Sequence, residues 1–468
     1  MNSKLHYTVP VLVVAGMFLI QTDFVSSQSF RARDPGVRTD PPGAPPSAGG
    51  PINRLTANEL RFFMSGKAEF EEVEELDEGL GPTLNLDSCG GCHAQPATGG
   101  TSPAINPQVA FARAASPSQV PAVDAFIREG GPVREARFVK NPDGTPDGGV
   151  HALFTITGRE GADNCRLEQP DFDRELGRNN VIFRIPSPVF GAGLIEHIPD
   201  TTILANQSSN ATRKRDLGIR GHANFRVSGR TISGQANNNG NDGTVSRFGW
   251  KAQNQTLLLF SGEAYNVEMG ISSELFQVER DETPTCQFAN VPNTSQDFEA
   301  TDALTGTTDI QSFGNFQRFL APPKPSTNTP GGAESIARGR SQFESTGCAL
   351  CHTPTLRTGK STVVALKYRD ANLFSDLLVH DMGPGLADGV SQGQAGPREF
   401  RTAPLWGLGQ RIFFLHDGRT SDLLEAIAEH RSGSTRAGDA SEANEVIGIF
   451  NNLRESQKQD LLNFLRSL

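Results

Sequence analysis

Apolar and polar positions alternate at helical spacing just after the N-terminal region of the chain. Thr56 and Glu59 have the spacing of a capping box, in which each side chain bonds the backbone N–H of the other residue. Leu60, Phe63 and Met64 follow at intervals that place them on one helix face. The pattern predicts a helix that begins after Thr56 and buries these three side chains.

Helical spacing also marks the end of the chain. Two apolar stripes follow each other there: Val446, Ile449, Phe450 and Leu453, and then Leu461, Leu462, Leu465 and Leu468. Ser456 and Gln459 have capping-box spacing, which predicts that the last helix starts between the stripes. Asp422 and Glu425 open another helix in the same way. We expect both stripes to be core.

The middle of the chain has a different character. Residues 136–158 and 181–185 have a strand-like pattern, and the Asn- and Gly-rich stretch 233–244 is typical of a loop. The 49 Gly and 30 Pro of the chain agree with long loop regions. We therefore expect β and loop insertions between the helical regions.

Charge and composition narrow the class of protein. The 468 residues are 36% hydrophobic and 21% charged, which is typical of an ordered globular protein. The net charge is −10, which argues against a nucleic-acid partner, because contacts with phosphates need clustered Lys and Arg.

The N-terminus predicts export. Residues 1–27 contain Lys4, a short apolar run and small residues before Gln28, as in a cleaved signal peptide. An uncleaved anchor is the alternative. We expect a periplasmic protein with no membrane span after signal cleavage, in which the Pro- and Gly-rich residues 28–54 form a flexible linker.

Four of the six cysteines lie in two copies of one motif, C-x-x-C-H. The copies are Cys89, Cys92 and His93, and then Cys348, Cys351 and His352. This is the attachment signature of haem c, in which two thiols form thioethers with the porphyrin and the histidine binds the iron. Zinc binding and disulfides are the alternatives. The motifs predict two covalently bound haem c groups.

Cys165 and Cys286 remain outside these motifs. In an oxidising compartment a structural disulfide is the expected state of such a pair. A redox-active pair is the alternative.

The chain also contains an internal repeat. The two haem motifs lie 259 residues apart (348 − 89), and residues 248–258 align without gaps with residues 414–424. In this alignment Trp250 and His416 are equivalent. We interpret the repeat as two haem domains in tandem, 55–329 and 330–468, the first enlarged by insertions. The predicted fold is mainly α, with two cytochrome c-like domains and large loop and β insertions in the first.

Several further motifs resemble one family, the bacterial di-haem oxidoreductases, which are relatives of the di-haem cytochrome c peroxidases. The matching segments are G-L-G-P at 79–82, S-C-G-G-C-H at 88–93, G-G-T-S-P at 99–103, R-F-G-W-K-A at 247–252, N-V-E-M-G at 266–270, H-D-M-G-P-G-L-A-D at 380–388, R-T-A-P-L-W at 401–406 and F-L-H-D-G-R at 414–419. The resemblance extends from about residue 55 to the end of the chain.

The resemblance implies a division of labour between the haems. Electrons would enter at the C-terminal haem from a small donor protein, a cytochrome c or a cupredoxin, and hydrogen peroxide would react at the N-terminal haem. Trp250 would assist electron passage, and Glu268 would serve as the acid and base. The alternatives are purely structural: Trp250 would be a core aromatic residue, and Glu268 would form an ion pair at the surface.

Met382 is the candidate for the sixth ligand of the C-terminal haem. It follows His352 by 30 residues in a Gly- and Pro-rich loop, and a thioether ligand raises the reduction potential of the iron. A core methionine is one alternative, and ligation by His380 instead is another.

The chain departs from the related peroxidases at the first haem. Many of these enzymes have a second histidine ligand shortly after the first motif, but residues 94–110 contain no His. We therefore expect a five-coordinate N-terminal haem, with an unexpected ligand as the alternative. The relatives also hold calcium between their domains, but no acidic loop of this sequence demands calcium.

These observations predict an exported di-haem oxidoreductase that resembles cytochrome c peroxidase. Two alternatives stay open from the sequence alone. One is a di-haem cytochrome that carries electrons without catalysis, and the other is a di-haem enzyme that oxidises a protein or thiol partner.

Overall fold

The computed structural model describes most of the chain. The described residues are 30–44, 46–114, 124, 126–158, 162–225, 231–232, 235–236, 245–273, 275–277, 283, 285–286, 307–433 and 438–468. The chain divides into two compact units, Met1–Arg31 and Ala32–Leu468, and the second contains both haem motifs. The predicted signal peptide, residues 1–27, lies outside the described residues. None of the helices in the described part has the length and apolar character needed to cross a bilayer.

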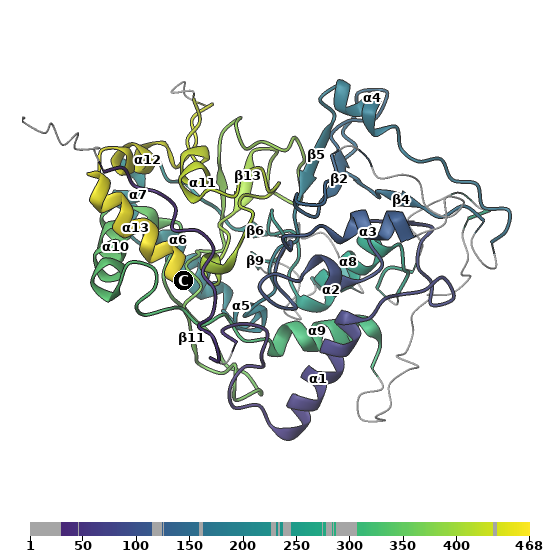
Figure 1. The fold of residues 1–468 in the computed structure, drawn as a ribbon, viewed down its shortest axis with the longest axis horizontal. Helices are drawn as coiled ribbons and strands as arrows, with labels where there is room; N and C mark the ends of the chain where they lie inside the picture. The colour runs from purple at the N-terminus through teal and green to yellow at the C-terminus, as the bar shows by residue number, and fades with distance from the viewer. Residues whose placement is uncertain are drawn as a thin grey trace, which may run out of the picture. The chain divides into compact units, whose positions relative to one another are not determined.

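The second unit is mainly helical, as predicted (Figure 1). The helices before the second motif are α1 (Ala57–Glu71), α2 (Cys89–Cys92), α3 (Pro107–Ala114), α4 (Phe172–Gly177), α5 (Ala192–Glu196), α6 (Asp200–Ser208), α7 (Ala211–Asp216), α8 (Leu257–Met269) and α9 (Asp309–Phe319). The later helices are α10 (Ala333–Thr346), η1 (Cys348–Leu350), η2 (Leu408–Gln410), α11 (Leu423–Glu429), α12 (Asn444–Asn451) and α13 (Glu455–Ser467).

Short strands form small antiparallel sheets between the helices. The strands are β1 (Thr83–Leu84), β2 (Glu135–Phe138), β3 (Val150–His151), β4 (Phe154–Thr155), β5 (Val181–Arg184), β6 (Asn224–Phe225), β7 (Thr231–Ile232), β8 (Gln235–Ala236), β9 (Val245–Ser246), β10 (Leu356–Arg357), β11 (Asp370–Ala371), β12 (Val379–Asp381) and β13 (Glu399–Arg401). One sheet has three strands in the order β3-β2-β5, in which Ala136 lies opposite both His151 and Phe183. The other strands pair as β1-β4, β6-β9, β7-β8, β10-β11 and β12-β13.

Two helix crossings repeat the same arrangement. α1 packs against α9, and α10 packs against α13 (Figure 1). Each crossing has a glycine at the contact: a β-carbon on Gly66 would overlap the carbonyl oxygen of Ser312, and one on Gly339 would overlap that of Asp460. Each pair of helices lies within one of the two haem domains predicted from the sequence, and the boundary between those domains stays a prediction.

These crossings predict that replacing a helical glycine by alanine destabilises the protein, which is the reverse of the usual effect. Glycine inside a helix is normally less stable than alanine by about 1 kcal/mol, but Gly339→Ala would force α10 and α13 apart, and overpacking costs about 1–3 kcal/mol. We expect a lower midpoint of chemical denaturation. Gly448→Ala in α12 is the matched control, because a β-carbon there meets no atom within 4 Å. A stabilised Gly339→Ala variant would contradict the close crossing.

The repeat that pairs residues 248–258 with residues 414–424 is also present in the backbone. An isolated bridge joins Phe248 to Asn254, and another joins Phe414 to Thr420. α8 and α11 then begin at residues 257 and 423, each nine residues after the first residue of its bridge (257 − 248 and 423 − 414). The gapless alignment predicted from the sequence therefore describes equivalent backbone structures.

The helix predictions need three corrections. The capping box of Thr56 and Glu59 is present, but Leu60 and Met64 are exposed, since the buried face of α1 runs through Phe63, Gly66 and Phe70.

The other two corrections concern the end of the chain. In α12 the predicted core residue Ile449 is exposed, since the buried face runs through Val446, Ile447 and Phe450. The last helix begins at Glu455, and Arg454 rather than Ser456 occupies the cap position.

The segment predicted as a flexible linker packs against the C-terminal helix where the structure describes it. Ala32 is buried, and the carboxylate of Asp34 forms an ion pair with the buried Arg466 of α13 at 2.6 Å. Further along, Ile52 donates its backbone N–H to Phe319. The compact unit therefore starts at Ala32 and not near Leu55. Long-range ion pairing and hydrogen bonds fasten the segment, together with apolar contacts of Ala32, Ala48 and Ile52.

A disulfide joins Cys165 to Cys286, as expected. Both cysteines are fully buried, and with Ala162 they form a small apolar cluster of their own. The bond fastens two segments that lie 121 residues apart in the sequence.

Candidate functional site

Each C-x-x-C-H motif lies in the wall of a large cavity. We call the cavity beside Cys89, Cys92 and His93 the N-terminal cavity, and its volume is about 140 Å³. The C-terminal cavity, beside the second motif, has a volume of about 220 Å³.

The two cavities collect the residues predicted from the sequence. The N-terminal cavity is lined by Cys89, Cys92, His93, Trp250 and Glu268. The C-terminal cavity is lined by Cys348, Cys351, His352, Met382 and again Trp250.

The two motif histidines have the same orientation. Nδ1 of His93 bonds the carbonyl of Gly100 at 3.0 Å, and Nδ1 of His352 bonds that of Phe374 at 3.1 Å. These bonds place the proton on Nδ1, which leaves Nε2 as the ligating atom. Burial lowers the pKa of each histidine to about 4, so both imidazoles are neutral, as a metal ligand must be.

The motif cysteines carry unpaired thiols. The disulfide of the described residues is Cys165–Cys286, while all four motif cysteines are reduced. Burial raises the pKa of Cys89 and Cys92 strongly, and that of Cys348 to about 11. Thiols that face a cavity without joining each other fit attachment to a group in that cavity, and they disagree with disulfides inside the motifs.

Two buried cations also fit a haem in the C-terminal cavity. Arg401 and Arg411 line this cavity, and among the described residues no carboxylate lies within ion-pair distance of either. They bond the carbonyls of Gly249 and Pro404 instead. Burial lowers the pKa of each to about 10. A buried cation without a counter-charge is costly, and the carboxylates of a haem would supply the missing negative charge.

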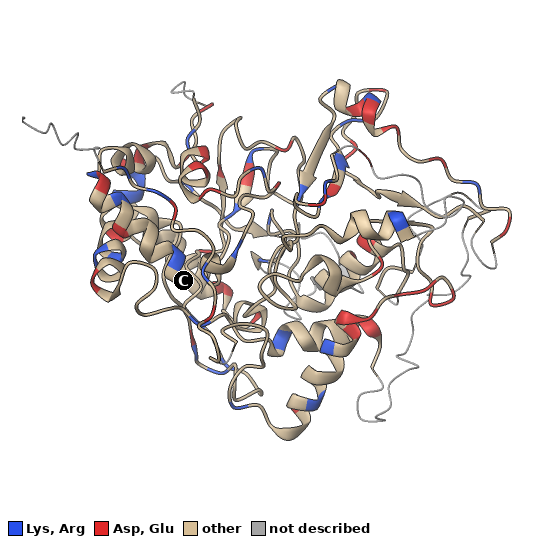
Figure 2. Cartoon of the chain, in the orientation of Figure 1, with Lys and Arg blue, Asp and Glu red and all other residues tan. Residues whose placement is uncertain are grey.

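Other basic side chains near the cavities form ion pairs with carboxylates. Figure 2 shows Lys and Arg interspersed with Asp and Glu along the chain. Arg184 of β5 is paired with the buried carboxylate of Asp388 at 2.6 Å, and Lys251 bonds the same carboxylate at 3.0 Å. These pairs leave Arg401 and Arg411 as the clearest candidates for contact with a bound anion.

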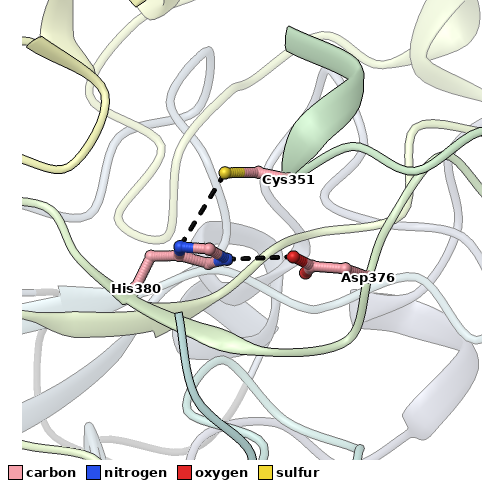
Figure 3. A group of neighbouring side chains, drawn as sticks. All are labelled: Cys351, Asp376 and His380. Carbon is pink, nitrogen blue, oxygen red and sulfur yellow. Dashed lines mark hydrogen bonds and ion pairs between the residues drawn. The ribbon is translucent and has the colours of Figure 1, made fainter. Parts of the chain in front are cut away.

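A group of titratable side chains lies beside the second motif (Figure 3). Nδ1 of His380 is 2.8 Å from Glu442, and Nε2 is 3.1 Å from Asp376, while the sulfur of Cys351 lies 3.8 Å from Nδ1. Burial opposes the charged form, but Cys351 and Asp376 raise the pKa of His380 well above its usual value. An imidazolium held by two carboxylates has no lone pair for a metal, which argues against both zinc at this cluster and iron ligation by His380.

Met382 follows β12 directly and is half-buried in the wall of the C-terminal cavity. Its backbone N–H donates to Arg398. The position agrees with a side chain near the haem, and its role as a ligand stays a prediction.

Trp250 lies between the cavities and lines both. Its indole N–H donates to the carbonyl of Ile185 at 2.9 Å, and its ring meets the ring of His416 edge-on, with centres 6.4 Å apart. His416 in turn stacks on Phe400 in the wall of the C-terminal cavity. The two residues that the repeat makes equivalent therefore form one aromatic contact between the cavities.

Glu268 has a carboxyl partner that the sequence analysis missed. It hydrogen-bonds Glu135 of β2, whose other neighbour is the guanidinium of Arg137 at 2.7 Å. All three side chains line the N-terminal cavity. Burial would raise the pKa of Glu135, but the charge of Arg137 and the hydrogen bond from Glu268 lower it.

The hydrogen bond between Glu268 and Glu135 involves a proton that the two carboxyl groups share. A hydrogen bond between two carboxyl groups requires that one of them is protonated. The guanidinium of Arg137 stabilises the charged form of Glu135, which favours Glu268 as the protonated partner of the pair. The pair is thus a carboxylic acid with a fixed anionic acceptor in the cavity of the first motif, an arrangement suited to proton transfer.

Comparison with known proteins identifies the family of this chain. Residues 151–468 match the model of the family described as "Di-haem oxidoreductase, putative peroxidase". The match covers more than half of the chain, and this protein belongs to that family. The family is di-haem, which implies two haems. A search of the curated proteins found no match.

Two solved structures are similar in part. One is a MauG-like protein associated with microbial copper homeostasis, with 20% identity and a TM-score of 0.24, where the match covers 36% of this chain and 58% of the other. The second is hydrazine synthase of Kuenenia stuttgartiensis, with 12% identity and a TM-score of 0.36 over 92% of this chain and 98% of the other.

Proposed function

We propose that this di-haem oxidoreductase reduces hydrogen peroxide at the N-terminal cavity with electrons that enter at the C-terminal cavity. The donor would be a small redox protein, a cytochrome c or a cupredoxin. The observation that carries the proposal is the hydrogen-bonded pair of Glu268 and Glu135 in the wall of the cavity beside the first C-x-x-C-H motif.

Haem attachment and proton donation would fall to different residues. Thioethers at the four motif cysteines and bonds from His93 and His352 would hold two haem c groups, whose irons supply the redox chemistry. Reduction of peroxide to two waters consumes two electrons from the donor and two protons. Breaking the O–O bond requires a proton on the departing oxygen, and Glu268 holds a proton in the cavity where that oxygen would lie.

Export to the periplasm is part of the proposal. The disulfide of Cys165 and Cys286 is a bond that persists in oxidising compartments. Residues 1–27 have the pattern of a signal peptide.

Binding of carbon monoxide to the reduced protein and of cyanide to the oxidised protein tests the proposal. We expect each ligand to change the absorption spectrum of one haem, the N-terminal one, and hydrogen peroxide to oxidise added reduced cytochrome c catalytically. A protein that binds neither ligand at either haem would be an electron carrier. Ligand binding without peroxide turnover would favour the enzyme that oxidises a protein or thiol partner.

Trp250→Phe tests the path between the haems. The variant loses the indole ring that lines both cavities and the hydrogen bond to Ile185. We expect electron transfer between the haems to slow by about tenfold, a barrier increase of about 1.4 kcal/mol, while both haem spectra stay unchanged. Stopped-flow reoxidation by peroxide measures this rate. The control is Trp406→Phe, and equal rates in both variants would remove Trp250 from the path.

A further inference from the structure

We propose that His430, and not Met382, is the sixth ligand of the C-terminal haem iron. His430 follows directly after α11 and lines the C-terminal cavity together with His352. The inference rests on the proposed haem at the second motif and goes beyond it, because it assigns a ligand and a coordination type.

The first argument is the distance between the two imidazoles. The ring centres of His352 and His430 lie 6.5 Å apart, with an angle of 56° between the planes. Metal–imidazole bonds are about 2 Å long, so two imidazoles on opposite sides of one iron have ring centres about 6 Å apart. The observed separation leaves room for one metal atom between the two rings.

The second argument is the orientation of the His430 ring. Its Nδ1 bonds the carbonyl of Ala426 at 2.7 Å, just as Nδ1 of His352 bonds the carbonyl of Phe374. Nδ1 therefore carries the proton, and Nε2 is left for coordination. Within the described part of the chain, Nε2 of His430 has no hydrogen-bond partner.

The competing ligands fit less well. Both ring nitrogens of His380 already bond carboxylates, those of Asp376 and Glu442. Met382 lines the same cavity. His430 combines a ring fixed through Nδ1 with the separation from His352 that one metal atom requires.

The third argument comes from the internal repeat. The aligned segments are offset by 166 residues (414 − 248), and the same offset relates α8 to α11 (423 − 257). The position equivalent to His430 is therefore 264 (430 − 166), which is Ala264, and it lines the N-terminal cavity. The same place in the two copies thus has an imidazole beside one haem and a methyl group beside the other. One substitution between the copies gives one closed iron and one open iron.

The assignment changes the expected properties of the C-terminal haem. A His/Met pair raises the reduction potential relative to two imidazoles. A bis-imidazole haem would therefore have a lower potential than the sequence analysis predicts. It would still be six-coordinate and closed to exogenous ligands.

Spectroscopy of the holoprotein tests the ligand without reference to turnover. We expect electron paramagnetic resonance and near-infrared magnetic circular dichroism of the oxidised wild type to show one low-spin bis-imidazole haem. In His430→Ala this signal should disappear, the C-terminal haem should become high-spin and bind carbon monoxide, and added imidazole should restore the original signal. His430→Met keeps a ligand at the site, so it should convert the signal to that of an imidazole–thioether haem.

Met382→Leu is the matched control, and we expect it to leave the spectra unchanged. An imidazole–thioether signal in the wild type that Met382→Leu abolishes would overturn the assignment. So would a bis-imidazole signal that survives in both His430 variants. Because the readout is the ligand field of the C-terminal iron, it stays valid if the protein does not reduce peroxide, and failure of the proposed function is detected separately.

Discussion

Glu268→Gln is expected to lower the rate of peroxide reduction by about 10²–10⁴-fold, the usual contribution of a general acid–base group. An amide keeps the size of the side chain and its hydrogen-bonding capacity toward Glu135, but it cannot release a proton to the departing oxygen. Steady-state oxidation of reduced cytochrome c by peroxide measures the loss. Haem content, spectra and carbon monoxide binding should stay close to those of the wild type.

The cavity offers a second Glu-to-Gln substitution as a control for this variant. Glu263 also lines the N-terminal cavity, but its carboxylate is bonded by the amide of Asn254. Glu263→Gln removes a carboxylate from the same wall and should cost far less than Glu268→Gln. Similar losses in both variants would mean that any Glu-to-Gln change in this wall lowers the rate, and that the proton of Glu268 has no special role.

Glu135 should act as a positioning residue. In Glu135→Gln the acceptor that holds the proton of Glu268 loses its charge, and Arg137 loses its ion pair. We expect a smaller loss of turnover than in Glu268→Gln, together with a changed dependence of kcat on pH. A dependence identical to that of the wild type would leave Glu135 with a structural role alone.

The chemistry that depends on local sequence was predictable. The spacing of Cys89, Cys92 and His93 follows from the geometry of one porphyrin edge, so no knowledge of the fold is needed to identify it. The capping box at Thr56 is present as predicted, and Asp422 caps α11 without a return bond from Glu425, whose carboxylate bonds Thr420 instead. The alignment of the repeat was also correct, because each bridge and the helix after it form a local unit.

Contacts between distant segments were not predictable in the same way. Glu135 and Glu268 are separated by 133 residues (268 − 135), and nothing near Glu135 marks it except the alternating Glu135 and Arg137 of one strand face. Asp34 and Arg466, which order the N-terminal segment, are 432 residues apart. Such pairs depend on how the helices and strands pack, and that packing is not encoded in any short window.

His430 lies between features that local sequence predicts and contacts that only the fold reveals. Extending the alignment of residues 248–258 and 414–424 by six positions pairs Ala264 with His430 (264 − 258 and 430 − 424), so the difference between the two copies was present in the sequence. Its meaning required the structure, which shows that both positions face cavities. A repeat therefore identifies candidate ligands most clearly at positions where its copies differ in chemistry.

Ala264→His is expected to close the N-terminal haem. If the two copies are equivalent at this position, the new imidazole lies where His430 lies in the C-terminal copy, and it would coordinate the first iron. A tethered ligand gains about 10²–10⁴-fold over a free one, so carbon monoxide affinity and peroxide turnover should fall by at least about 10²-fold. Magnetic circular dichroism should then show two low-spin bis-imidazole haems.

Ala264→Leu separates coordination from simple blockage of the cavity. Leucine fills a comparable volume without a nitrogen, so it should reduce access to the iron but leave the haem high-spin. A high-spin N-terminal haem in Ala264→His, with carbon monoxide affinity equal to that of the leucine variant, would show that residues 264 and 430 are not equivalent. The structural basis for one open and one closed iron would then have to lie outside α8 and α11, since a change at the paired position would have failed to convert one type of site into the other.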